Sequence, residues 1–202
     1  METDLAGCER RECNNSNGLR LDEDSVNIEF VATENLTDIQ KDSIQKLRAA
    51  VYPPELLATL PGRLFTWASP QWSVLVWDED ELIAKVGMLV RDAFHDNAPR
   101  RIGGIGGVMT HSAKEGQGLA SQAMREASKR FATDLNVSYA LLFCLPALVE
   151  FYKRLNWKPF DGKIFVEQPN GKVEFSANGA MVLDVKEQAP LDGVMDLNGL
   201  PW

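Results

Sequence analysis

The feature that most constrains this chain is a glycine-rich apolar segment that leads through a glycine turn into a long amphipathic helix. Residues 102–110 contain four glycines among apolar side chains, which predicts a strand. A turn over residues 113–118 follows and contains Gly116 and Gly118. Apolar side chains then recur every four residues up to Leu135, which predicts a helix from about residue 118.

A strand, a glycine turn and a helix in this order have the physics of an anion-binding site. The first N–H groups of a helix lack internal partners, and the helix dipole adds positive potential there. Glycine lets the backbone approach a bulky pyrophosphate. A spaced glycine pair also occurs at ordinary strand–helix turns, so a purely structural role stays open. The Rossmann fingerprint is excluded because Ser121 stands three residues after Gly118, and no P-loop pattern is present.

The remaining hydrophobic patterns predict an α/β chain. Alternation predicts strands near residues 26–30, 73–77 and 82–90, the last two forming a hairpin. Thr37 is the expected N-cap of a helix that ends at Pro53, and a short helix is expected over residues 55–60. The apolar run 139–145 predicts a strand buried on both faces. A helix then follows from Pro146 to Asn156, with strands expected at 163–168 and 180–185.

We expect a loop at residues 95–100 and irregular structure over 186–202. The order of elements predicts an α/β (α+β) sandwich with a mixed, mostly antiparallel sheet and helices on both faces. Residues 1–24 are polar, acidic and without periodicity, so we expect a flexible tail followed by one domain over residues 25–202.

Composition excludes several classes of function. The net charge of −8 gives no footprint for nucleic acid, and no apolar run is long enough for a membrane helix. Three cysteines are too few for a disulfide framework, and two distant histidines give no zinc signature. The N-terminus does not read as a secretory signal. We therefore expect a cytoplasmic protein without a metal. The acidic balance favours a cationic small substrate, although solubility is the simpler explanation.

The stretch Glu115-Gly-Gln-Gly-Leu-Ala120 resembles the acetyl-CoA signature of the GNAT superfamily, Q/R-x-x-G-x-G/A. The two small positions match, whereas Glu115 stands where the family prefers Arg or Gln, a position that contributes mostly its backbone N–H. A carboxylate near a pyrophosphate is unfavourable by Coulomb's law. The resemblance implies that acetyl-CoA is the co-substrate and is bound by Val108, Met109, Thr110, Glu115, Gly116, Gln117, Gly118, Leu119 and Ala120.

The run Phe151-Tyr-Lys-Arg-Leu-Asn-Trp157 resembles the second signature of the same family, with Asn156 in place of the usual glycine. Both residue types tolerate the left-handed conformation that ends a helix. The resemblance implies that Tyr152 protonates the departing CoA thiolate, since a tyrosine hydroxyl is protonated at neutral pH. A half-buried core tyrosine is the alternative.

In the family, the glycine-rich strand splays from the next parallel strand, and the pantetheine arm of acetyl-CoA inserts there. By resemblance, the backbone of Val108 and Thr110 would pair with pantetheine, and the N–H of Val108 or Met109 would stabilise the thioester oxyanion. Many relatives carry a glutamate base on this strand, but residues 103–107 hold no carboxylate. His111, a water chain or an acid of the C-terminal segment stay open as the base.

The C-terminal half is similar, more loosely, to the aminoglycoside 2'-N-acetyltransferases. The shared features are Phe-Tyr-x-x-x-x-Trp-x-Pro and a tail that ends in Leu-Pro-Trp. In those enzymes tail acids and a terminal tryptophan line a pocket for a cationic sugar, which implies substrate contacts for Asp196 and Trp202 here. Otherwise Asp196 is an exposed acid and Trp202 pins the terminus.

Three functions remain open from the sequence. The first is a transferase that acetylates a primary amine of a small, cationic, aminoglycoside-like acceptor by direct attack in a ternary complex. The second is a protein or peptide N-acetyltransferase, and the third is a non-catalytic acyl-CoA sensor. A homodimer is compatible with each.

Overall fold

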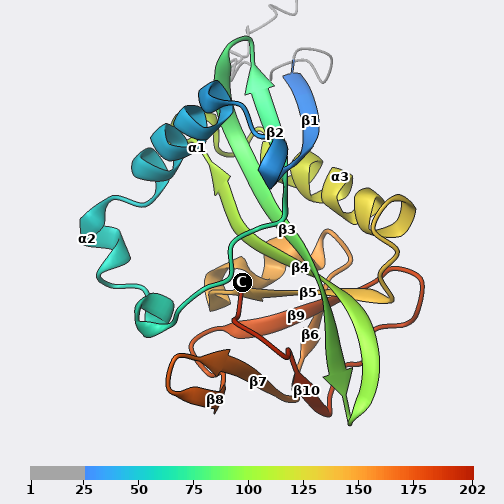
Figure 1. Cartoon of the computed structure of the whole chain (residues 1–202). Helices are drawn as coiled ribbons and strands as arrows, with labels where there is room; N and C mark the ends of the chain where they lie inside the picture. The colour runs from blue at the N-terminus through green and yellow to red at the C-terminus, as the bar shows by residue number, and fades with distance from the viewer. Residues whose placement is uncertain (1–25) are drawn as a thin grey trace, which may run out of the picture.

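The computed structural model describes residues 26–202, so the tail predicted over residues 1–24 lies outside the described part. Ten strands of the described part form one mixed sheet in the order β6-β9-β5-β4-β3-β10-β7-β8, while β1 pairs with β2 and β2 with β3 (Figure 1). Among the strands of residues 26–202, only the β4–β5 and β10–β7 pairs are parallel. The predicted mixed, mostly antiparallel sheet is therefore confirmed. The strands are β1 Val26–Ala32, β2 Trp72–Asp78, β3 Glu81–His95, β4 Ala98–Thr110, β5 Tyr139–Cys144, β6 Lys158–Phe160, β7 Lys163–Gln168, β8 Gly171–Glu174, β9 Gly179–Asp184 and β10 Val194–Asp196.

The main helices cover opposite faces of this sheet, as predicted (Figure 1). They are α1 Asp38–Val51, α2 Pro54–Leu57, α3 Leu119–Thr133 and α4 Val149–Lys153, with 3₁₀ turns η1 Thr33–Asn35, η2 Pro61–Leu64, η3 Ser112–Lys114 and η4 Pro146–Leu148. Helix α1 begins where the sequence predicts, because Thr37 and Gln40 form a capping box. Its Leu47 packs with Leu75 and Met109 on one face. The apolar stripe of α3, which includes Phe131, packs on the other.

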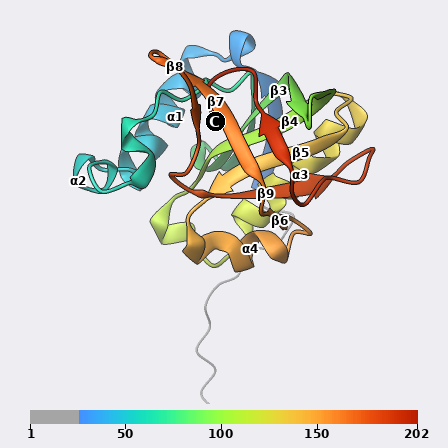
Figure 2. The same ribbon diagram turned by 90° about the horizontal axis from the view of Figure 1, so that it is seen from below.

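Two predictions about loops were wrong. Residues 95–100 are not a loop, because β3 and β4 continue to His95 and Ala98 and are joined by the two-residue turn Asp96-Asn97. Both turn residues have positive φ, 48° and 64°, which this hairpin turn requires and which Asp and Asn tolerate. Residues 186–202 are not wholly irregular, because they contain β10, whose few residues pair with β3 and β7 (Figure 2). The short strands β6 and β8 were also not predicted.

The glycines of β4 allow close packing on both faces of the strand. A Cβ on Gly103 would lie 2.5 Å from the ring of Phe131 in α3. A Cβ on Gly104 would lie 2.4 Å from the indole of Trp202 on the opposite face. Residues 197–202, which we call the C-terminal strap, lie against this second face, and the Trp202 indole N–H donates to the Leu141 carbonyl at 3.0 Å. The glycine-rich strand is thus held between a helix and the strap.

We predict that Gly103→Ala destabilises the fold by about 1–3 kcal/mol, because its methyl group overlaps Phe131 in a packed core. The measurement is the free energy of unfolding in urea. Gly179→Ala is the matched control, since its Cβ would meet its nearest neighbour at 3.7 Å, an ordinary contact. Combining Gly103→Ala with Phe131→Leu should cost less than the two single changes together; strict additivity would contradict the packing argument.

Candidate active site

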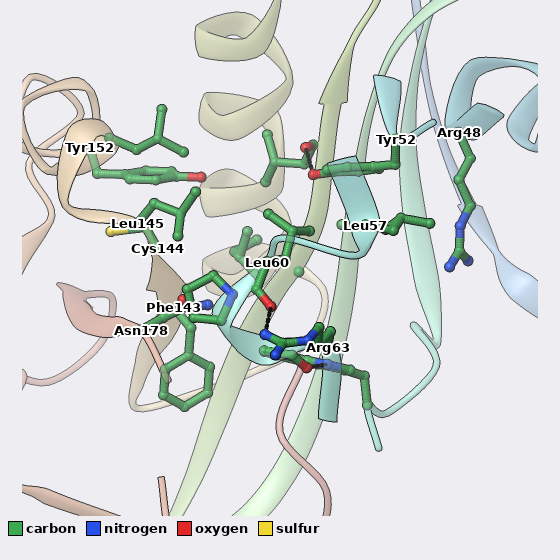
Figure 3. Close-up of a pocket in the computed structure, with 18 residues that line it drawn as sticks. Arg48, Tyr52, Leu57, Leu60, Arg63, Phe143, Cys144, Leu145, Tyr152 and Asn178 are labelled. Atoms are coloured by element: carbon green, nitrogen blue, oxygen red, sulfur yellow. Dashed lines mark hydrogen bonds between the residues drawn. The ribbon is translucent and has the colours of Figure 1, made fainter. Parts of the chain in front are cut away.

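A cavity opens where β4 and β5 stop pairing. The parallel pairing runs from Ile102↔Tyr139 to Ile105↔Leu142 and ends there. Beyond it, residues 106–108 of β4 and residues 143–145 at the end of β5 line opposite sides of a cavity of about 450 Å³ (Figure 3). The splayed pair of strands that the family resemblance implies is therefore present.

A β-bulge in β4 accompanies this separation. The register between β3 and β4 shifts between Lys85↔Met109 and Gly87↔Gly106, so that one residue of β3 faces two of β4. Gly107 lies in the bulge with a φ of 57°, a conformation that glycine adopts without steric cost. A bulge bends its strand and disrupts the ladder. Here it falls on the stretch of β4 that lines the cavity.

The cavity is closed on the other side by α1, α2 and η2. Its lining is largely apolar, with a few polar groups: Arg48, Tyr52, Leu57, Leu60, Pro61, Gly62, Arg63, Trp67, Ile105, Gly106, Gly107, Val108, Phe143, Cys144, Leu145, Leu148, Tyr152 and Asn178. The Asn178 side-chain oxygen is buried and has no hydrogen-bond partner within residues 26–202. An unpaired buried acceptor is costly, so this oxygen suits a ligand that donates a hydrogen bond.

Two tyrosines face each other across this cavity. The hydroxyl groups of Tyr152 and Tyr52 both point into it, from α4 and from the end of α1 (Figure 3). Burial raises the pKa of Tyr152 well above its ordinary value, so its hydroxyl carries its proton at neutral pH. The Tyr52 hydroxyl donates to the Val108 carbonyl at 3.3 Å. That carbonyl keeps a second lone pair for a pantetheine amide.

Asn156 ends the segment that carries Tyr152. Its φ is 66°, the left-handed conformation expected for the residue that replaces glycine in the second signature. The Trp157 N–H donates back to the Tyr152 carbonyl at 3.1 Å. This closing turn fixes the helix that presents Tyr152 to the cavity.

The turn between β4 and α3 is open. Gly116 and Gly118 have φ values of 75° and 83°, and a Cβ added to either would meet no atom within 4 Å. Within the described residues, the N–H groups of 116–121 have no hydrogen-bond partner. Glu115 is exposed, Leu119 is buried in the core and Gln117 and Ala120 are half-buried. The turn therefore offers free main-chain donors at the start of a helix, as an anion site requires.

Two side chains near the turn have structural partners instead. Lys114 forms an ion pair with Asp78 at 2.7 Å, so its charge is already compensated. His111 accepts from the Ala113 N–H at 3.3 Å and caps η3. His111 does not line the cavity. Of the predicted cofactor residues, Val108 lines the cavity, Met109 is buried beneath α1 and Thr110 ends the strand.

The two predicted acceptor residues lie elsewhere. Trp202 is buried, with its indole under the Arg91 guanidinium at 5.1 Å from the ring centroid. Asp196 forms an ion pair with Lys172 and accepts from the Asn198 N–H at 3.0 Å, contacts that lower its pKa. Neither residue lines the cavity. A substrate role for them stays a prediction.

Sequence reasoning missed Lys85, which is 6% exposed and lies in β3 between Leu75 and Met109 of the neighbouring strands. It has no ion pair or hydrogen bond to any residue of 26–202. Burial, with a contribution from the charge of Arg48, lowers its pKa to about 8. The signal was available, because Lys85 is the one charged residue within the apolar run 82–90. No pattern in the sequence marked Tyr52, Arg48 or Arg63 as residues of the cavity.

Two further findings concern the described residues. None of the helices in that part of the chain is long and apolar enough to cross a membrane. No group of three or more His, Cys, Asp or Glu side chains among residues 26–202 could hold a metal ion.

Comparison with known proteins places the chain in a family. The profile of the family described as "Acetyltransferase (GNAT) domain" matches residues 35–160. That range is more than half of the chain and holds the splayed strands, the open turn and Tyr152. The chain belongs to the GNAT acetyltransferase family. No curated protein sequence matches it at a significant level.

Solved structures support the same fold. Escherichia coli ElaA superposes with a TM-score of 0.56 at 18% identity, over 79% of this chain and 99% of that one. The E. coli GNAT family N-acetyltransferase YhbS, in complex with CoA, gives 0.56 at 14% identity, over 86% and 89%. A GNAT acetyltransferase from Brucella melitensis, in complex with acetyl-CoA, gives 0.52 at 12% identity, over 84% and 94%. At these identities the likeness concerns the fold. Similarity to aminoglycoside 2'-N-acetyltransferases is not shown by these comparisons.

We predict that Lys85→Met raises the free energy of unfolding at pH 7 by on the order of 2 kcal/mol, because it removes a buried charge that has no ion pair within residues 26–202. The folded-state pKa of about 8 lies below the ordinary 10.5, so the charged lysine opposes folding below pH 8. The unfolded chain binds more protons between these values, so this contribution to wild-type stability rises with pH across that window.

The measurement is urea unfolding of both proteins from pH 7 to pH 10.5, and the quantity of interest is their difference. The advantage of the variant should shrink as pH rises. A difference that is independent of pH would mean that Lys85 is not a buried cation in the folded protein.

Proposed function

We propose that the chain is an acetyl-CoA-dependent N-acetyltransferase that acetylates a primary amine of a small molecule by direct attack in a ternary complex. The observation that carries the proposal is the presence on the same strand β4 of a gap toward β5 that opens into a cavity and, just after the strand, of an open glycine turn. Two of the similar structures hold CoA or acetyl-CoA, which supports the same co-substrate.

Different segments of the chain would bind different parts of this co-substrate. The free N–H groups of 116–121 would hold the pyrophosphate, helped by the dipole of α3. The pantetheine arm would lie between β4 and β5, with its amides on the backbone of Val108 and Thr110. The thioester would then lie in the cavity, near the N–H of Val108 or Met109 as the oxyanion donor.

The chemistry needs a proton donor for the thiolate and a route for the proton of the amine. Tyr152 supplies the first, since its hydroxyl points into the cavity and its raised pKa keeps it protonated. No carboxylate lines the cavity among the described residues. We therefore assign removal of the amine proton to water, and the Asn178 oxygen to a hydrogen bond with the amine.

The acceptor is a small amine in this proposal. Its expected cationic character has no support in the cavity lining, which holds two arginines and no acid among residues 26–202. Cytoplasmic location, a homodimer and the domain division at residue 25 remain predictions. The alternative is an acyl-CoA sensor, which binds acetyl-CoA without transferring the acetyl group. The first experiment below distinguishes this sensor from a transferase.

We predict that Tyr152→Phe lowers the turnover number by on the order of 100-fold, since it removes the thiolate's proton donor. The affinity for acetyl-CoA should hardly change. The measurement is CoA thiol release with an amine panel, together with calorimetry of acetyl-CoA binding. Tyr139→Phe is the control, because this buried tyrosine lies outside the cavity and its hydroxyl has no partner within residues 26–202. Equal turnover of Tyr152→Phe and wild type would remove Tyr152 from the mechanism. Binding without turnover in the wild type would favour the sensor.

We predict that Gly118→Asp abolishes CoA binding, because it places a carboxylate among the free N–H groups of the turn. Gly118→Asn is the matched control, since it has nearly the same shape without the charge and tolerates the φ of 83°. Calorimetry with CoA should show weakened binding for Asn and none for Asp. Retained binding by the Asp variant would contradict the assignment of the pyrophosphate site.

A further inference from the structure

The charges around the cavity point to the class of acceptor. Its lining includes Arg48 and Arg63 and no acidic residue among the described part of the chain. Neither arginine forms an ion pair within residues 26–202; Arg63 donates only to the Leu60 carbonyl, at 3.4 Å. Both side chains are exposed at the cavity and are free to meet a ligand. A cationic acceptor would be repelled here.

Lys85 adds a third positive charge beneath the cavity floor. Its Nζ lies 4.0 Å from the position of a Cβ on Gly107, and Gly107 lines the cavity. Because Lys85 pairs in register with Leu75 and Met109, it projects from the same face of the sheet, under α1. A side chain 6% exposed and without a counter-ion is rare for lysine. No acidic side chain of residues 26–202 pairs with its charge.

The two ends of the cavity differ in chemical character. Tyr152 and Arg48 lie at opposite ends of it, and the leucines Leu57 and Leu60 lie between them (Figure 3). The thioester end is the one marked by Tyr152 in the proposed function. A ligand that reaches from one end to the other therefore meets a proton donor first, an apolar wall next and positive charge last.

We propose that the acceptor is an amine with an apolar framework and an anionic group, carboxylate or phosphate, at the end remote from the amine. The anion is bound by Arg48 and Lys85, and the amine faces the thioester beside Tyr152. This inference rests on the proposed function, since it names the substrate of that site. Charge-assisted hydrogen bonds to these side chains would make the anion a determinant of specificity.

The test is a series of acceptors with one framework and three end groups: ω-aminohexanoate, hexylamine and α,ω-diaminohexane, with the butyl and octyl homologues and with ω-aminoalkyl phosphates. Thiol release from acetyl-CoA gives kcat/KM for each. We expect the carboxylate or phosphate acceptor to exceed the neutral one by about 10- to 100-fold, the worth of one charge-assisted hydrogen bond in a buried site. The diamine should be the poorest. A preference for the diamine, or no preference, overturns the proposal.

Variants of Lys85 and Arg48 test whether these side chains cause the preference for an anionic acceptor. Lys85→Met should raise KM for the anionic acceptor by about 10- to 100-fold and so remove most of its advantage over hexylamine. Arg48→Gln should act in the same direction. Lys46→Gln, which removes an equal charge from the exposed side of α1 outside the cavity, is the control. Equal loss with charged and neutral acceptors would mean a structural role for Lys85.

A binding measurement keeps the test independent of turnover. Calorimetry of the CoA complex should show tighter binding of N-acetyl-aminohexanoate than of N-acetylhexylamine, and Lys85→Met should remove the difference. If CoA binds but these two products bind equally or not at all, the anionic acceptor is wrong while the assignment of the CoA site stands. If CoA itself does not bind, the proposed function fails first.

Discussion

The loss of pairing between β4 and β5 is the constraint on which the site depends. Two parallel strands that separate inside a sheet expose main-chain groups of both strands, and such groups are costly without partners. The fold meets this cost in part, because the Tyr52 hydroxyl donates to Val108 and the bulge at Gly107 turns β4 away from the regular ladder. What remains is a cavity with polar edges, which an extended ligand with amide groups would complete.

The part of β4 around Gly103 and Gly104 is tightly packed on both faces, in contrast to the part that lines the cavity. Gly103 and Gly104 leave room for Phe131 on one face and Trp202 on the other. The glycines thus explain why this strand carries no carboxylate: a side chain at Gly104 or Gly106 would overlap the C-terminal strap. The strap is tied to the segment after η2 by the Ala68 N–H, which donates to the Pro201 carbonyl at 2.6 Å.

Local rules predicted the elements around the site well. Apolar periodicity predicted α3, a continuous apolar run predicted β5, Thr37 marked the start of α1, and Gly116 and Gly118 marked the turn. The failures have two causes. The hairpin that ends at His95 and Ala98 is local, since these two residues pair with each other, and its Asp96-Asn97 turn was not recognised in the sequence. The short strand β10 instead depends on partners far along the chain, which no local pattern shows. The opposite placement of Tyr52 and Tyr152 is likewise a consequence of the fold. Lys85 is different, since a lysine within an apolar strand can be recognised in the sequence itself.

Net charge and local charge lead to opposite conclusions about the acceptor. The chain has a net charge of −8, yet within the described part of the chain the cavity lining has two arginines and no acid, and Lys85 lies beneath it. Exposed charges far from a site are screened within about 10 Å at ordinary ionic strength, whereas charges in a partly dry cavity are screened much less. The local set therefore decides which acceptor binds. A ligand that compensates the charge of Lys85 would offset the stability that this buried lysine costs. The cost of Lys85 to the fold and the chemistry of the acceptor are therefore two aspects of one interaction.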